Sequence, residues 1–280
     1  MKIFTKVKSI IPTYQKHGID GIIYSILKNL KLNTRFVSIL EKKKYYIEKR
    51  IIDLTNKEVI KGPYKSTKLT CKTHWKGFDV SSKLIGFYEQ QVQEKIISLQ
   101  KKFDLENLIN FGCGDGYHLI GLLKNDYFKQ GLAFERDQFG IDQIKENATL
   151  NNVKEKVTIF ESANFKDVSK TLNDDQLKKS LFLVDIEGAE FDLFNQSNLN
   201  CFKNSILLIE NHHFYAKKIS VDNFFVFMKK HFNLEVLMNG SRNPYEIDQI
   251  ANFDDDEKWL IASEGRKQTM DWLVFTPKNS

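Results

Sequence analysis

The side chains best suited to chemistry follow two short apolar segments of the chain. Three carboxylates come within six residues after segment 181–184, and a carboxylate and an imidazole come after segment 205–209; they are Asp185, Glu187, Glu190, Glu210 and His212. An imidazole oriented by a carboxylate is a suitable general base for a hydroxyl group. We therefore expect His212, Asp185 and Glu210 to form a catalytic group.

Two other interpretations of these residues remain open. Carboxylates together with an imidazole could hold a divalent metal ion, although the sequence favours catalysis without a metal. Glu190 could instead be an acid in the first turn of a helix, where its role is purely structural.

A glycine-rich segment, residues 110–117, forms a second candidate site. Gly112, Gly114 and Gly116 allow a sharp backbone turn and a close approach to a ligand. The segment opens a predicted helix, whose free N–H groups favour a carboxylate or phosphate. The third glycine follows the second by two residues, whereas the dinucleotide-binding fingerprint needs three. We expect these glycines and Cys113 to bind a nucleoside cofactor other than NAD.

An acid at the end of the next apolar segment supports this interpretation. Glu135 comes 23 residues after Gly112, and a carboxylate at this place accepts hydrogen bonds from both hydroxyls of a ribose. Together, the three glycines and Glu135 favour S-adenosyl-L-methionine as the cofactor. The other residues assigned to its binding are Arg136, Ser162, Ala163 and Asp185, of which Ser162 and Ala163 are expected near the adenine.

The elements that position these residues alternate between strands and helices after residue 104. Short apolar runs bounded by turn residues predict strands at 108–111, 131–134, 157–160, 181–184, 205–209, 234–238 and 272–275. Such alternation is typical of a parallel sheet covered by helices on both faces, and right-handed crossovers then favour a doubly wound α/β fold. The last strand follows a long detour, which fits a hairpin added to the edge of the sheet.

The first 80 residues are predicted to form a basic extension of helices and a short hairpin, and residues 81–280 the main domain. Helical spacing of apolar residues covers 20–52, residues 59–80 suggest a hairpin or strap, and another helix begins at Leu84 and runs to about Leu99. The extension holds 18 Lys and Arg against 6 Asp and Glu, although the whole chain carries only +6. A basic surface can meet nucleic acid, lipid or an acidic substrate.

Composition narrows the class of protein. The three cysteines are far apart, with no CxxC pair, so neither a zinc knuckle nor a disulfide framework is predicted, and a cytoplasmic location fits best. We expect no signal peptide and no transmembrane segment. Peripheral membrane contact through the N-terminal region remains open.

The motifs resemble those of a known family. Residues 110–117 resemble motif I of class I methyltransferases, Glu135 resembles their ribose-binding acid, and residues 185–190 resemble the D-x-E-G-A-E signature of FkbM-type methyltransferases. The resemblance spans roughly residues 104–276. It implies a Rossmann-like seven-stranded sheet, S-adenosyl-L-methionine and O-methylation of a hydroxyl on a sugar, glycan or other small molecule.

Two other functions compete with this one. The basic N-terminal region suggests an RNA methyltransferase, but no motif for stacking or flipping a base supports it, so no specific nucleic acid is expected. A non-catalytic partner protein with the same fold is the other alternative. The intact glycines and Glu135 favour retained cofactor binding.

Overall fold

The computed structural model describes residues 39–72, 78–266 and 270–278. By its internal contacts the chain forms two compact units, Met1–Arg50 and Ile51–Ser280. The second unit holds the sheet and every candidate site residue. No helix among the described residues is long and apolar enough to cross a membrane.

Seven strands form one sheet, in the order β3-β2-β1-β4-β5-β7-β6. The first five strands along the chain pair in parallel, and β7 pairs antiparallel with both β5 and β6. The strands are β1 Asn107–Phe111, β2 Gln130–Phe134, β3 Val157–Phe160, β4 Ser180–Val184, β5 Ile206–Glu210, β6 Phe232–Leu237 and β7 Trp272–Pro277. The order reverses between β1 and β4, which is where ligands bind in open sheets of this kind.

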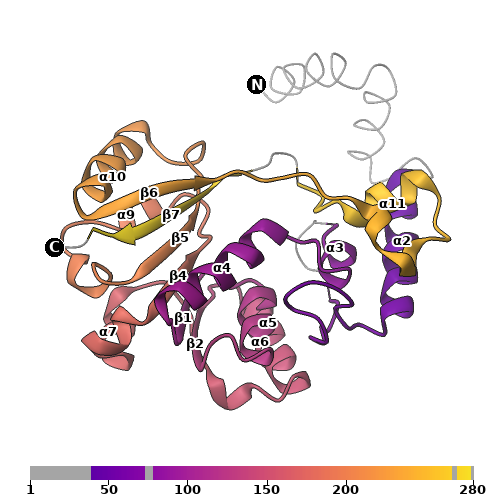
Figure 1. The fold of residues 1–280 in the computed structure, drawn as a ribbon, viewed down its shortest axis with the longest axis horizontal. Helices are drawn as coiled ribbons and strands as arrows, with labels where there is room; N and C mark the ends of the chain where they lie inside the picture. The colour runs from indigo at the N-terminus through magenta and orange to yellow at the C-terminus, as the bar shows by residue number, and fades with distance from the viewer. Residues whose placement is uncertain (1–38, 73–77, 267–269, 279–280) are drawn as a thin grey trace, which may run out of the picture. The chain divides into compact units, whose positions relative to one another are not determined.

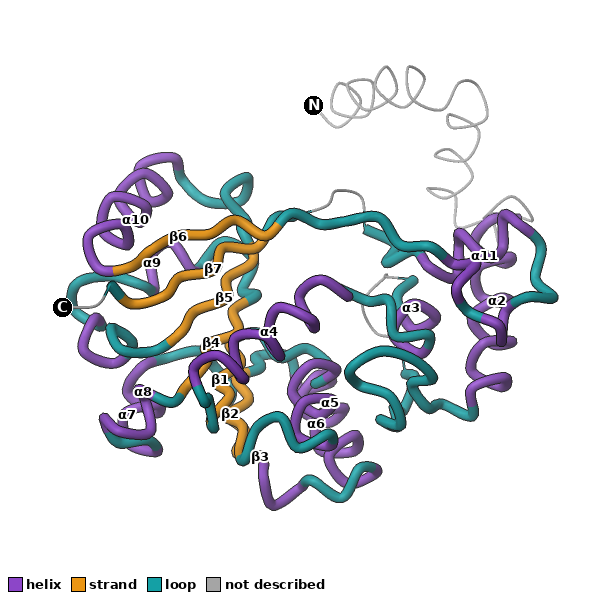
Figure 2. The backbone as a smooth tube through the Cα atoms, in the orientation of Figure 1, coloured by secondary structure: helices purple, strands orange, loops and turns teal. Residues whose placement is uncertain are grey.

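Helices of the second unit cover both faces of the sheet (Figures 1 and 2). Helices α4, α5 and α6 lie on one face, and α7, α9 and α10 lie on the other. The helices are α2 Ile39–Thr55, α3 Val80–Leu84, α4 Gln90–Phe103, α5 Tyr117–Lys124, α6 Gln138–Leu150, α7 Phe165–Thr171, α8 Asp174–Lys178, α9 Glu190–Leu193, α10 Lys218–His231 and α11 Asp255–Ala262, with 3-10 turns η1 Lys154–Lys156, η2 Leu199–Cys201, η3 Pro244–Glu246 and η4 Asp248–Ile250.

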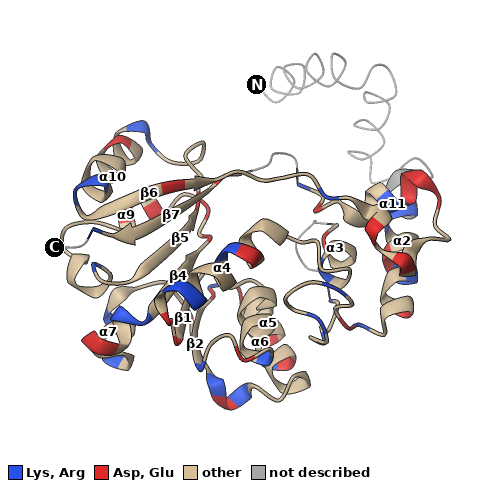
Figure 3. Cartoon of the chain, viewed as in Figure 1, with Lys and Arg blue, Asp and Glu red and all other residues tan. Residues whose placement is uncertain are grey.

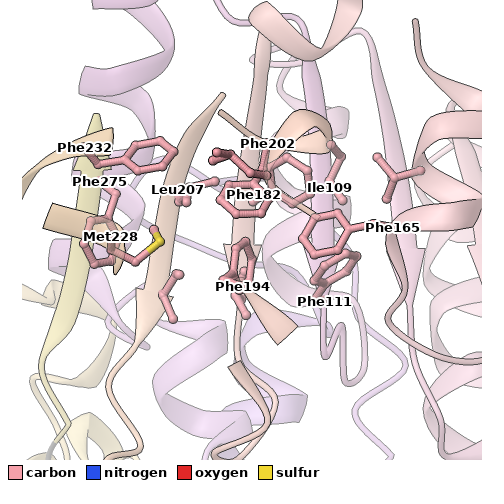
Figure 4. Packing of buried hydrophobic residues seen from close by; sticks show 14 of the residues in the cluster. Ile109, Phe111, Phe165, Phe182, Phe194, Phe202, Leu207, Met228, Phe232 and Phe275 are labelled. Atoms are coloured by element: carbon pink, nitrogen blue, oxygen red, sulfur yellow. The ribbon is translucent and has the colours of Figure 1, made fainter. Parts of the chain in front are cut away.

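An aromatic core fills the face covered by α7, α9 and α10 (Figure 4). Alternate residues of each central strand point to this face because side chains alternate along a strand. Phe111 of β1 packs edge-on against Phe134 of β2, with ring centroids 4.8 Å apart. Phe165 and Phe194 pack the same way at 5.3 Å. The core holds the sheet rigid beneath the loops that carry the candidate site.

The predicted strands are confirmed within two residues at each end, and so is the doubly wound α/β class. The single helix predicted over 84–99 is wrong: α3 ends at Leu84 and α4 begins at Gln90. Gly86 separates them with a φ of +79°, and a Cβ there would lie 2.0 Å from the carbonyl oxygen of Lys61. A close backbone contact from elsewhere in the chain therefore breaks a helix that the local pattern favours.

Within the second unit, the segment before α3 is held by side-chain amides of α6 and of the residue after it. Asn151 accepts a hydrogen bond from the amide of Lys68 (2.8 Å) and donates one to its carbonyl (2.7 Å). In the described part, the predicted hairpin is a single antiparallel bridge between Glu58 and Lys68. Of the helix predicted over 20–52, α2 accounts for the part from Ile39; the rest lies outside the described residues, and the division at residue 80 stays a prediction.

Charged residues of both signs are mixed along the helices, as α4 and α10 illustrate (Figure 3). Residues 39–72, the described part of the predicted basic extension before the gap at 73–77, hold ten Lys and Arg against four Asp and Glu. Residues 1–38 of the extension lie outside the described residues, so the predicted basic surface stays a prediction.

Candidate functional site

The glycine bend after β1 is held against the end of β4. Gly112 has a φ of +76°, and a Cβ there would lie 1.7 Å from the carbonyl oxygen of Asp185. No other residue fits at this position without moving one of the two strands. Gly114 also has a positive φ, +58°, but a Cβ there would meet nothing within 4 Å. The bend is thus anchored at Gly112 and open at Gly114.

Glu135, at the end of β2, reaches the same bend. Its Oε2 accepts a hydrogen bond from the amide of Gly114 at 2.7 Å, and its Oε1 accepts one from the amide of Asp137 at 2.8 Å. A Cβ on Gly140 would lie 2.8 Å from both the Glu135 side chain and the carbonyl oxygen of Gly114. The acid and the glycines lie together as predicted, and each carboxylate oxygen keeps a lone pair for a further donor.

The remaining residues assigned to the cofactor lie at the same edge in different environments. Cys113 is buried, and burial, followed by the charges of Glu135 and Asp115, raises the pKa of its thiol well above the usual value, so the thiol is neutral. Arg136 and Ser162 are exposed. Ala163 packs against the aromatic core. Their roles in binding stay predictions.

The carboxylates after β4 surround one imidazole. His212 has a side chain that is 4% exposed, and its Nε2 lies 3.6 Å from Asp185, 3.7 Å from Glu187 and 3.3 Å from Glu210. Its Nδ1 lies 3.3 Å from the fully buried Glu190. Because parallel strands β4 and β5 are neighbours, their ends bring together the three residues predicted to be catalytic.

These carboxylates control the charge of His212. Burial alone lowers the pKa of an imidazole, but Glu190 and Glu210, followed by the charge of Asp185, raise the pKa of His212 to about 11. Burial and the charge of Glu210 raise the pKa of Asp185 well above its usual value. The imidazole is therefore cationic at neutral pH in the absence of another cation, and its predicted role as a base stays a prediction.

The loop after β4 has an unusual backbone that fixes these groups. Glu187 has a φ of +55° and Gly188 a φ of +101°. The buried Glu190 accepts hydrogen bonds from the amide of Gly188 (2.9 Å) and from the amide of His212 (3.2 Å). Glu190 thus joins the loops after β4 and β5. It is also the first residue of α9, the position expected in the structural alternative considered from the sequence.

A partly buried arginine beside the cluster was not assigned any role from the sequence. Arg266 forms ion pairs with Glu89 and Glu210, and with Glu264 at 3.0 Å. It also donates a hydrogen bond to the hydroxyl of Tyr88 at 3.0 Å. No local pattern links Arg266 to Glu89 and Glu210, which lie far away in the chain.

A second buried histidine lies on α5. The Nδ1 of His118 lies 2.9 Å from the hydroxyl of Tyr64, and its Nε2 lies 2.7 Å from Glu89. Burial and the charge of Lys83 lower the pKa of His118 to about 4, so the ring is neutral. A neutral ring that carries its proton on Nε2 donates to Glu89 and accepts from Tyr64, which satisfies both nitrogens.

The start of α5, predicted to bind an anion, already carries one from the chain. Asp115 accepts a hydrogen bond from the amide of Tyr117 at 3.1 Å, and its other oxygen lies 2.7 Å from the ammonium of Lys83. Lys83 also pairs with Asp79 at 2.8 Å. No pattern in the sequence pointed to this buried lysine.

Comparisons with known proteins give similarity in structure only. No protein-family model matches the sequence, and no curated protein matches it. A proposed O-methyltransferase from Klebsiella pneumoniae is 12% identical, with 95% of this chain and 99% of the other covered and a TM-score of 0.47. A precorrin-6y C5,15-methyltransferase from Geobacter metallireducens is 13% identical over 70% of this chain and 92% of the other, with a TM-score of 0.44. A proposed tRNA methyltransferase from Streptococcus pneumoniae is 13% identical over 67% and 69%, with a TM-score of 0.42.

The class of fold follows from the sheet itself. The strand order, with β7 antiparallel between β5 and β6, is the Rossmann-like fold of class I methyltransferases that the sequence motifs implied. Fold alone does not determine function, so the activity has to be argued from the site.

Proposed function

We propose that this chain is an S-adenosyl-L-methionine-dependent methyltransferase that methylates a hydroxyl group of a sugar, a glycan or another small molecule. The observation that carries the proposal is the hydrogen bond from the amide of Gly114 to the carboxylate of Glu135. It puts an acceptor for a ribose diol and an open glycine bend at one place on the carboxyl edge of the sheet.

The residues present fit this cofactor. Gly114 faces open space, so a ligand can approach the backbone there. The two oxygens of Glu135 each accept one backbone hydrogen bond and have capacity left for the two ribose hydroxyls. The neutral thiol of Cys113 adds no charge to the bend. The spacing of the glycines disfavours a dinucleotide, as noted from the sequence.

The position of the acid–histidine cluster supports a role in binding the acceptor. Asp185 contacts Gly112 of the bend through its backbone and His212 of the cluster through its side chain, so the two parts of the site adjoin. The side chain of Asp185 is 35% exposed, whereas those of His212 and Glu210 are buried. Of the three residues predicted to be catalytic, Asp185 is therefore the one that an acceptor reaches first.

Methyl transfer to a hydroxyl group requires alignment of the acceptor with the methyl group and removal of one proton from the acceptor. When bound, S-adenosyl-L-methionine supplies a methyl group on a sulfonium, and its carbon–sulfur bond breaks as the acceptor oxygen bonds to that carbon. The chain's task is to hold the acceptor hydroxyl in line with this bond and to take up its proton at the cluster of His212, Asp185 and Glu210.

Calorimetry with S-adenosylhomocysteine tests the proposal without a known acceptor. The wild-type chain should bind it, and Glu135→Ala should bind at least about tenfold more weakly because the diol loses its acceptor. Glu155→Ala, an exposed acid in η1, is the matched control and should bind like the wild type. No binding by the wild type would refute the function, and unchanged affinity in Glu135→Ala would refute the role of that residue.

A further inference from the structure

We infer that Asp185, Glu187 and His212 form a binding site for a divalent transition-metal ion of the Mn²⁺ type. One ligand atom from each of these residues lies within 4.8 Å of the other two. Three features support such a site: the separations of these atoms, a buried oxygen without a hydrogen-bond partner, and the environment of the other imidazole nitrogen.

The separations match shared coordination of an ion better than hydrogen bonding. Nε2 of His212 lies 3.6 Å from Oδ1 of Asp185 and 3.7 Å from Oε2 of Glu187. A hydrogen bond between such atoms spans about 2.7–3.2 Å. Two ligand atoms that each lie about 2.1 Å from one ion are roughly 3.0–4.3 Å apart, depending on the angle between them.

The site also contains an oxygen that lacks a donor. Oδ1 of Asp185, the atom nearest to Nε2 of His212, is buried and has no hydrogen-bond partner among the described residues. A buried oxygen without a partner is costly. In the same part of the chain, the ion pairs of Asp185 and Glu187 are with His212 alone, whereas Glu210 also pairs with Arg266. A cation bound between Asp185 and Glu187 would give the unpartnered oxygen a partner and would balance the charge of the two carboxylates.

The far side of the imidazole has the environment typical of a metal-bound histidine. Histidines that bind metals commonly donate their second N–H to a carboxylate, which fixes the ring and its tautomer. Nδ1 of His212 lies 3.3 Å from Oε1 of Glu190, beyond hydrogen-bond distance, and has no hydrogen-bond partner among the described residues. Glu190 is fully buried and is held by the amides of Gly188 and His212. This carboxylate faces Nδ1 while Nε2 is directed at Asp185 and Glu187.

The ligand set indicates the class of ion. Carboxylate oxygens suit Mg²⁺, Ca²⁺ and Mn²⁺, whereas an imidazole suits the later first-row ions. Mn²⁺ accepts both, and Mg²⁺ retains its waters and uses mainly oxygen ligands. Three protein ligands leave positions for water or for an acceptor oxygen. On the proposed function, which this last step requires, the ion would bind the acceptor hydroxyl and ease the loss of its proton.

The site can be tested without cofactor or acceptor. Mn²⁺ is titrated into the protein, and the electron paramagnetic resonance signal of the free ion measures how much remains unbound. The EDTA-treated wild-type chain should remove one Mn²⁺ per chain from the free pool. Asp185→Asn and Glu187→Gln should each weaken binding at least about tenfold, since each loses a charged ligand. Asp192→Asn, an exposed acid on α9, is the control and should bind like the wild type.

Glu187 makes the test robust because its side chain is 76% exposed and its replacement spares the core. Failure of the wild type to bind Mn²⁺ stoichiometrically, or equal binding by Glu187→Gln and Asp192→Asn, would overturn the inference. Either result is separate from the calorimetry with S-adenosylhomocysteine, which needs no metal.

Discussion

The guanidinium of Arg266 donates a hydrogen bond to the carboxylate of Glu210. This contact joins the segment before β7 to the end of β5, beside His212. The same guanidinium pairs with Glu89 and Glu264. The three acids are each 5% exposed or less. Glu264 also pairs with Arg242 and Glu210 with His212, whereas Arg266 is the cation that faces Glu89 among the described residues.

We expect Arg266→Met to lower the free energy of unfolding by about 3–5 kcal/mol, because removal of one partner leaves buried charges uncompensated. Urea unfolding at neutral pH measures the change. The exposed Lys230→Met should stay within about 0.5 kcal/mol of the wild type. Equal stability of the two variants would show that the acids do not need this arginine.

The two glycines of the bend should differ in their tolerance of a side chain. Gly112→Ala puts a Cβ into the carbonyl of Asp185, so we expect a loss of about 3–5 kcal/mol. Gly114→Ala meets open space and bears only the cost of a left-handed backbone, about 1–2 kcal/mol. Urea unfolding of both variants gives the comparison, and a larger loss for Gly114→Ala would contradict the geometry.

His118 should make stability depend on pH. Its pKa is about 4 in the folded chain against 6.5 in the unfolded one, so the unfolded state takes up a proton first as the pH falls. The stability that the neutral ring contributes is complete above about pH 6.5 and is lost between pH 6.5 and 4. A shift of about 2.5 pKa units corresponds to roughly 3 kcal/mol.

His118→Gln should remove that part of the pH dependence while other groups keep theirs. We expect the difference in unfolding free energy between pH 7 and pH 4 to be about 3 kcal/mol smaller in the variant. Urea titrations of both chains at the two pH values measure it. Identical pH profiles would mean that His118 does not stay neutral in the folded protein.

His212→Ala should lower turnover by about 10²-fold or more, because the cluster loses the group at its centre, while the affinity for S-adenosylhomocysteine stays unchanged. Transfer of a labelled methyl group to a panel of sugars provides the assay. The adjacent, exposed His213→Ala is the control. Full activity of His212→Ala would move proton transfer to another group.

The sheet was predictable because each strand is a short apolar run with turn residues at its ends, and a buried parallel strand has just that pattern. The break between α3 and α4 was not predictable. Its cause is the contact of Gly86 with the backbone of Lys61, 25 residues earlier in the chain, and local periodicity carries no information on such a contact.

The candidate site, too, was predictable only in part. The proximity of Glu135 to the glycine bend, and of His212 to Asp185, follows from the rule that neighbouring parallel strands end at one edge. The pairing of Arg266 with Glu89 and Glu210 joins three distant parts of the chain. Sequence spacing cannot reveal it, because only the complete fold brings those acids together.

The position of β7 has a consequence for synthesis on the ribosome. Residues 272–277 lie between β5 and β6 in the sheet, although they are translated after both. Until they emerge, β5 has no partner on one side, and an unpaired strand edge invites pairing with other chains. We therefore expect the edge of β5 to be open to pairing with other chains until residues 272–277 have emerged, and a chaperone would be of most use to the nascent protein in that interval.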